Sequence, residues 1–227
     1  IVNAGSPVTM DWADAADDNS ARAVLTSFFA GQEQAESLVD VLLGDADPGG
    51  RLPTTIPVRL ADHPAYLHHR PDHDSAGNGT QVYGEGLFIG YRYYDARNIA
   101  PRFAFGHGLS YGSAMWGAAV ITSESADSIT VEVPVAGTGN RAATVVVQGY
   151  IAAIDRACIR PPKELKTWDK FVVEPGESRT AQLEFPRSAF RRWDTATGGW
   201  IVDAGEYDLV IAASATDVRQ RLQVTLV

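Results

Sequence analysis

The densest cluster of groups that could bind a metal ion is His68-His69-Arg70-Pro71-Asp72-His73-Asp74, with three histidines and two aspartates in seven residues. Zinc needs neutral imidazoles that one backbone geometry brings onto a single ion. Here Arg70 places a cation inside the cluster, and Pro71 stiffens the turn. We therefore favour a polar surface loop, and keep a metal site and a pH-responsive contact as alternatives.

Paired carboxylates could perform acid–base chemistry, and the sequence offers few pairs. An acidic group near the N-terminus lies in a polar run rich in alanine and asparagine, which favours a solvated helix start; its members are Asp11, Asp14, Asp17 and Asp18. Asp45 and Asp47 have a spacing that suggests calcium, but the remaining ligands of a binding loop are missing. We therefore expect no metal site at these carboxylates.

Composition excludes several classes of partner. The 227 residues carry a net charge of −9, and residues 1–113 contain 7 Arg and Lys against 14 Asp and Glu. No basic cluster is dense enough to neutralise phosphates, so neither nucleic acid nor an anionic membrane is expected to bind. Cys158 is the single cysteine, which precludes an internal disulfide, and we expect a buried, inert thiol. No signal peptide is visible, which leaves the compartment open between secreted and cytoplasmic.

The first half of the chain predicts one βα unit. Residues 23–29 form a short apolar run that is typical of a strand buried on both faces of a parallel sheet. Residues 32–43 follow as an amphipathic helix, with Gly44 as its stop and one apolar face comprising Ala35, Leu38, Val39, Leu42 and Leu43. Ile1-Val2 reads as the end of another buried strand, so we expect additional strands upstream of this chain.

The run from Val82 to Tyr111 combines apolar rings and chains with recurrent glycines at 84, 86, 90, 106 and 108. So much apolar area is unfavourable on a surface linker, and so many glycines are unfavourable in a regular helix or strand. We interpret residues 82–111 as irregular backbone that docks two packed bodies. The apolar members are Val82, Tyr83, Leu87, Phe88, Ile89, Tyr91, Tyr93, Tyr94, Phe103 and Phe105.

The second half predicts an immunoglobulin-like β-sandwich of about seven strands. Strand-like segments separated by glycine-rich turns cover residues 115–123, 128–135, 143–153, 180–185, 206–213 and 221–227. Pro161-Pro162 predicts an extended crossover between strands. We expect three tryptophans to anchor the core or its corners, with a sugar-stacking surface as the alternative; they are Trp168, Trp193 and Trp200.

Several motifs resemble one family in the same order. EGLFIGYRYYD followed by FAFGHGLSY resembles the closing signature of the second domain of family 3 glycoside hydrolases, the β-glucosidase and β-xylosidase group. Upstream, NAGSPVTM and AGQEQAESLVDVLLGDADPGGRLPTTIP resemble the last strands and helix of that domain. Downstream, RPPKELKTWDKFVVEPGES and GWIVDAGEYDLVIAAS resemble the fibronectin type III-like domain that follows it.

The resemblance implies residues 1–113 as the end of an α/β sandwich domain, including the 82–111 docking segment, and residues 114–227 as a fibronectin type III-like sandwich. The family removes terminal β-linked glucose or a similar sugar with retention, using two carboxyl groups and no cofactor. Neither carboxyl group has a counterpart here, so the resemblance implies no catalytic residue in this chain and gives Glu85, inside the signature, no catalytic role. Substrate-binding residues are not assigned.

The implied partners are the upstream part of the same enzyme, namely a barrel and the rest of the α/β sandwich, together with a small β-glycoside or oligosaccharide. A homo-oligomer is a further possibility. The alternative to a supporting portion of a glycosidase is an independent β-sandwich module that binds carbohydrate or protein.

Overall fold

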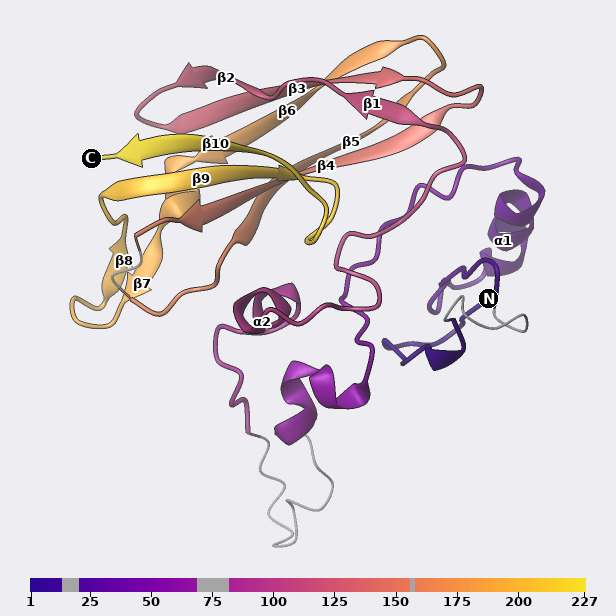
Figure 1. The fold of residues 1–227 in the computed structure, drawn as a ribbon, viewed down its shortest axis with the longest axis horizontal. Helices are drawn as coiled ribbons and strands as arrows, with labels where there is room; N and C mark the ends of the chain where they lie inside the picture. The colour runs from indigo at the N-terminus through magenta and orange to yellow at the C-terminus, as the bar shows by residue number, and fades with distance from the viewer. Residues whose placement is uncertain (14–20, 69–81, 156–157) are drawn as a thin grey trace, which may run out of the picture. The chain divides into compact units, whose positions relative to one another are not determined.

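The computed structural model describes residues 1–13, 21–68, 82–155 and 158–227 (Figure 1). The chain divides into two compact units. The first comprises Ile1–Ala46 and Arg51–His107, and the second comprises Asp47–Gly50 and Gly108–Val227. Most of the histidine cluster, from residue 69 to 74, and Asp14, Asp17 and Asp18 lie outside the described residues. Within the described part, no helix is long and apolar enough to cross a membrane.

The N-terminus of the first unit pairs in parallel with the predicted strand at 23–29. Val2 and Thr26 form a parallel bridge, in which Val2 N–H donates to Leu25 O at 2.8 Å and Ser27 N–H donates to Val2 O at 3.0 Å. The parallel arrangement is confirmed, but the pairing is limited to this bridge. The side chains at 24–28 are only half-buried, so the predicted burial on both faces is wrong for the described chain.

Helix α1 (Gln34–Leu43) confirms the amphipathic helix, and Gly44 ends it in the left-handed conformation with φ 85°. Asp45 N–H donates to Asp40 O at 2.8 Å, which satisfies a carbonyl of the last turn. The predicted apolar face, however, is not buried. Val39, Leu42 and Leu43 are 50%, 59% and 74% exposed.

The rest of the first unit is short helices and paired loops. The 3₁₀ turns are η1 (Asp11–Ala13), η2 (Leu60–Asp62) and η3 (Pro64–Leu67). Residues 52–56 run antiparallel to residues 102–107 through one bridge, Ile56 to Phe103. The prediction of wholly irregular backbone at 82–111 is wrong, because helix α2 (Tyr91–Arg97) occupies its glycine-free centre.

Burial along the 82–111 segment is uneven. Tyr94 and Ala104 are 4% and 6% exposed, and the rings of Tyr91 and Phe105 lie 5.2 Å apart. Five other apolar side chains of the segment are more than half exposed, which is more solvent contact than a buried docking segment implies; they are Val82, Tyr83, Leu87, Ile89 and Leu109.

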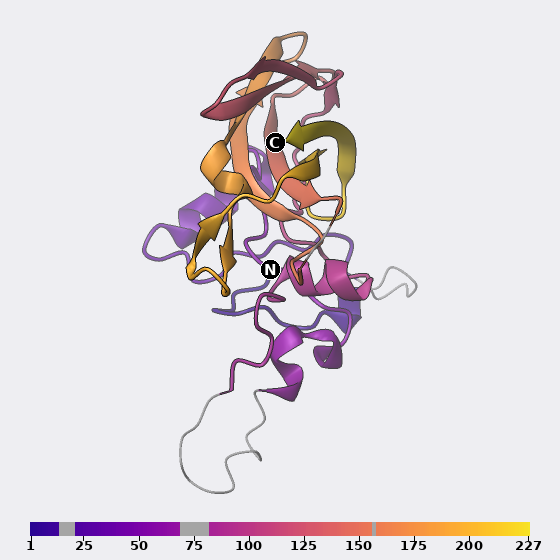
Figure 2. The same cartoon turned by 90° about the vertical axis from the view of Figure 1, so that its left-hand side faces the viewer.

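The second unit is an all-antiparallel β-sandwich with a separate hairpin (Figure 1, Figure 2). In one sheet, β3 pairs with β6 on one edge and with β1 and β2 on the other. The other sheet has the order β10-β9-β4-β5, and β7 pairs with β8. The strands are β1 (Ala114–Trp116), β2 (Val120–Glu124), β3 (Ser128–Gly137), β4 (Ala143–Ala153), β5 (Glu164–Val173), β6 (Ser178–Pro186), β7 (Arg192–Asp194), β8 (Gly199–Ile201), β9 (Gly205–Ala212) and β10 (Val218–Leu226).

Strict alternation builds the core between the two sheets. Ile129, Val131, Val133 and Val135 of β3 are at most 1% exposed; with the inward side chains of the neighbouring β6 they pack against β4 and β9 of the other sheet. A 3₁₀ turn, η5 (Arg187–Phe190), contributes Phe190 to this core. The predicted fold class, an α/β portion followed by an immunoglobulin-like sandwich, is confirmed.

The predicted single strand at 115–123 is broken into β1 and β2. The break lies opposite Pro134, which accepts a hydrogen bond from Gly117 N–H at 2.8 Å but has no amide hydrogen to donate. Gln220 of β10 fills the gap from the other sheet. Its side chain accepts from Ala119 N–H at 2.6 Å and donates to Gly117 O at 2.8 Å, which closes an otherwise open sheet edge.

Candidate functional site

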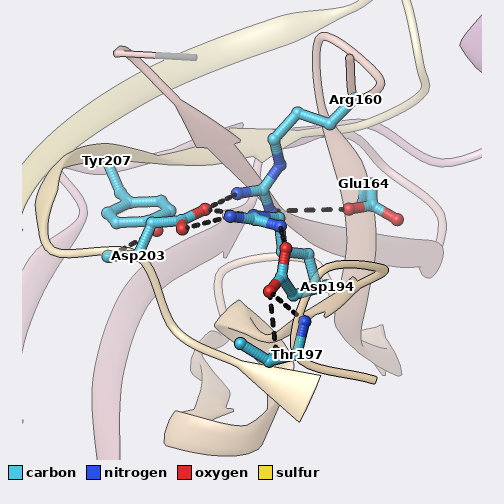
Figure 3. A network of polar contacts seen from close by, with 7 residues as sticks. Arg160, Glu164, Asp194, Thr197, Asp203 and Tyr207 are labelled. Atoms are coloured by element: carbon cyan, nitrogen blue, oxygen red, sulfur yellow. Dashed lines mark hydrogen bonds and ion pairs between the residues drawn. The ribbon is translucent and has the colours of Figure 1, made fainter. Parts of the chain in front are cut away.

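An ion-pair network joins the β7–β8 hairpin to the body of the sandwich (Figure 3). Arg192 of β7 makes a bidentate contact with Asp203, with Nε–Oδ2 at 2.6 Å and Nη2–Oδ1 at 2.9 Å, and its Nη1 lies 3.1 Å from Asp194 Oδ1. Asp194 Oδ2 accepts from the Thr197 amide at 3.0 Å and from its hydroxyl at 2.7 Å, which fixes the hairpin turn.

A second arginine brings the start of β5 into this network. The Arg160 side chain is 7% exposed, and its Nη1 and Nη2 lie 3.7 Å from Asp203 Oδ2 and 3.9 Å from Glu164 Oε2. Its guanidinium lies 5.9 Å from the centre of the Tyr207 ring. The Tyr207 hydroxyl donates to Asp203 O at 2.8 Å, so the loop before β9 is held through both its side chain and its backbone.

The charges of the network suit a structural clamp better than a proton donor. The hydrogen bond from Arg192 is the main cause that lowers the pKa of Asp203, and Thr197 is the main cause that lowers the pKa of Asp194. A general acid must keep its proton near neutral pH, which requires a raised pKa. These two carboxylates are shifted the opposite way, so they remain ionised and engaged with their partners.

Asp47 is a second polar centre of the sandwich, and hydrogen-bond donors from two other segments surround its carboxylate. Its carboxylate accepts from the Ser110 hydroxyl at 2.9 Å, the Tyr111 amide at 2.7 Å and the Thr144 amide at 3.2 Å. Burial raises its pKa, but the hydrogen bonds from Thr144, Tyr111 and Ser110 outweigh burial and leave the pKa below its ordinary value. Asp47 therefore fastens residues 47–50 to the start of β4.

Among the described residues of the first unit, His63 lies close enough to Glu85 for its pKa to respond to that charge. His63 Nδ1 accepts from the Ala65 amide at 3.2 Å, and burial lowers the pKa of His63 while the charge of Glu85 opposes that shift. The His68 ring lies so close to Gly84 that any side chain there would collide with it. Among the described residues, no group of three His, Cys, Asp or Glu side chains is arranged to hold a metal ion.

The expectation that three tryptophans anchor the core is wrong. Trp168, Trp193 and Trp200 are 64%, 51% and 64% exposed. Trp193 and Trp200 are cross-strand partners whose rings meet edge to face, with centres 5.6 Å apart and planes at 78°. Cys158 is also less buried than expected, because its side chain is partly exposed.

Sequence patterns offered a signal for only one contact of the ion-pair network. Arg160, Arg192 and Asp203 come from three separate segments, and no local spacing connects them. The motif RPPKELK contains both Arg160 and Glu164, and their i, i+4 spacing was the one available signal.

Two family models match the chain. The glycosyl hydrolase family 3 C-terminal domain matches residues 1–91, and the fibronectin type III-like domain matches residues 145–215. The chain is 39% identical to a β-glucosidase of Rhizobium radiobacter over 100% of its own length and 27% of that protein. It is 35% identical to a probable β-glucosidase I of Aspergillus oryzae over 96% of this chain and 26% of that protein. Bacterial and fungal relatives are thus both represented.

Solved structures agree with the sequence matches. The β-glucosidase of Kluyveromyces marxianus superposes with a TM-score of 0.89 at 32% identity, covering 98% of this chain and 26% of that one. DesR, a β-glucosidase from Streptomyces venezuelae, superposes with a TM-score of 0.89 at 32% identity over 99% of this chain and 28% of that one. The chain thus spans about a quarter of the length of these relatives. With two family models in the expected order and this agreement along nearly its whole length, the chain belongs to glycoside hydrolase family 3.

Proposed function

We propose that this chain is the C-terminal supporting portion of a retaining glycoside hydrolase that removes terminal β-linked glucose or a similar sugar. The observation that supports this most is the match to β-glucosidases along the whole chain, although the chain spans only 27% of the Rhizobium radiobacter relative. The reaction needs two carboxyl groups and no cofactor. The 16 arginines against 3 lysines support a bacterial source with GC-rich DNA.

Both catalytic carboxylates lie outside this chain in our proposal. Asp47, Asp194 and Asp203, the carboxylates of the two polar centres described above, all have lowered pKa values and accept hydrogen bonds. Glu85 lies in the family signature, and we assign it no catalytic role. We assign residues 1–113 to the end of the α/β sandwich domain, with 82–111 as its docking segment, and residues 114–227 to the fibronectin type III-like domain.

Exposed apolar surface on the first unit supports a partner from the same enzyme. Leu42 and Leu43 of α1 and Phe29 beside the Val2–Thr26 bridge are 59%, 74% and 74% exposed. An amphipathic helix gains its stability mainly from burial of its apolar face. We propose that the upstream barrel and the remaining strands of the α/β sandwich cover this face in the complete enzyme.

The purified chain of residues 1–227 is expected to hydrolyse a nitrophenyl β-glucoside at the background rate. A positioned general acid alone contributes about 10²–10⁴-fold, and a nucleophile adds a covalent route; the chain supplies neither. The measurement is release of nitrophenol against a buffer blank, with circular dichroism to show that the sample is folded. Turnover that survives repurification and follows the chain through size exclusion would refute the assignment.

A further inference from the structure

All three lysines of the chain fall within eight residues, at positions 163, 166 and 170. They lie in or just before β5, whose side chains alternate between the core and the outer face of the sheet. Phe171 and Val173 point into the core. From Thr167 onward the period of two therefore places Trp168, Lys170 and Val172 on the outer face; a register irregularity opposite Gly149 and Tyr150 of β4 interrupts the alternation before Thr167.

The three lysines have different surroundings. Lys163 is 8% exposed, with its Nζ 5.5 Å from the centre of the Tyr150 ring. Lys166 Nζ lies 3.7 Å from Glu164 Oε1, and both side chains are mostly covered. Lys170 is exposed, and in the described part of the chain it has no ion-pair partner. Of the three lysines, Lys170 is therefore the one that remains available to a ligand.

Trp168 stands next to Lys170 on the same face. Its side chain is 64% exposed, and within the described residues its ring contacts no other aromatic ring. The neighbouring strand adds no opposing charge, because Trp168 pairs with Gln148 and Lys170 pairs with Val146 in the register of β4 and β5. Trp193 and Trp200 differ in this respect, since each covers part of the other.

We propose that Trp168 and Lys170 form a surface site for a polysaccharide that carries uronic acids. Alternate positions on a strand lie roughly 6–7 Å apart, so an indole face and an ammonium group at this separation match the apolar face and the carboxylate of one hexuronic acid ring. The charge of Lys170 is the reason to expect an acidic sugar at this site. The net charge of −9 repels a polyanion from the rest of the surface, so a polyanion is attracted only where an unpaired cation faces it. The site is independent of the proposed glycosidase activity.

Native affinity electrophoresis of the intact chain in gels containing polygalacturonate tests this site. We expect retardation at low salt that weakens as salt is added, because exposed charges are screened. Trp168→Ala should weaken the apparent affinity about tenfold. Lys170→Gln should do so as well, whereas Lys170→Arg should retain binding. Trp200→Ala removes an equally exposed tryptophan elsewhere on the sandwich and should leave retardation unchanged.

Three results would overturn the proposal. Equal retardation in a neutral β-glucan gel that Lys170→Gln does not change would show that the surface binds neutral sugars without using the charge of Lys170. Retardation that Trp168→Ala leaves intact would place binding elsewhere on the chain. Absence of retardation in both gels, with the protein folded by circular dichroism, would mean that this face is covered by another part of the enzyme or is bare.

Discussion

Replacing Phe185 with alanine is expected to lower the free energy of unfolding of the β-sandwich by about 3–5 kcal/mol. Phe185 belongs to β6, is 0% exposed, and pairs with Ile129 of β3. Its ring reaches across to the other sheet, where it fills the space above Gly149 of β4; a methyl group on Gly149 would lie 2.6 Å from Phe185 Cζ. Removing the ring therefore leaves a cavity that two packed sheets cannot easily close.

Chemical denaturation of the intact chain, followed by tryptophan fluorescence, measures this effect. Phe29→Ala is the matched control, because the same side chain is deleted where it is 74% exposed, and a change within about 0.5 kcal/mol is expected. A loss at Phe185 no larger than the loss at Phe29 would show that the two sheets do not pack around this ring.

Asp47→Ala is expected to destabilise the sandwich by about 2–3 kcal/mol, because it deprives the Tyr111 and Thr144 amides and the Ser110 hydroxyl of a charged acceptor. We expect a value near the lower end of this energy range, because the carboxylate of Asp47 is only partly buried. Residues 47–50 should also become more accessible to protease, since Asp47 fastens them to the sandwich. Asp45→Ala, an exposed aspartate two residues earlier, is the control and should change little.

The loss of stability caused by Asp47→Ala should depend on pH in a defined direction. The folded-state pKa of Asp47 lies below its ordinary value of 3.8. Its contribution is therefore fully present above that value and is lost as the pH falls through the folded-state pKa. The stability difference between the wild type and Asp47→Ala should be constant above about pH 5 and shrink below about pH 4. A difference that grows in acid would contradict the hydrogen-bonded, ionised state of Asp47.

Local periodicity predicted the parts of the fold in which one side chain in two or four is buried. The alternation in β3 is of this kind, and helix α1 was found from the same sort of periodicity, although its apolar face is exposed in the structure. Strand β5 was missed because its inward positions include Thr167 and Asp169, so its pattern lacks apolar alternation. Helix α2 was missed because the recurrent glycines of 82–111 concealed the glycine-free run at 91–105, of which the helix occupies the first seven residues.

Contacts between residues that are far apart in the sequence could not be predicted from local residue spacing. Asp47 was considered as a calcium ligand, yet its partners Ser110 and Thr144 lie 63 and 97 positions away. The exposure of Trp168 was unexpected, since large aromatic rings usually contribute to cores. The apolar face of α1 was predicted correctly as a face, but the spacing of its residues could not show that Val39, Leu42 and Leu43 are exposed.

A chimeric β-glucosidase tests the central claim most directly. Residues 1–227 would replace the matching segment of the Rhizobium radiobacter β-glucosidase, to which they are 39% identical. The account predicts that the chimera hydrolyses a nitrophenyl β-glucoside within about a hundredfold of the parent, the size of one catalytic contribution, while the parent without the segment does not. A folded chimera with no activity, or a truncated parent with full activity, would contradict the supporting role of this chain.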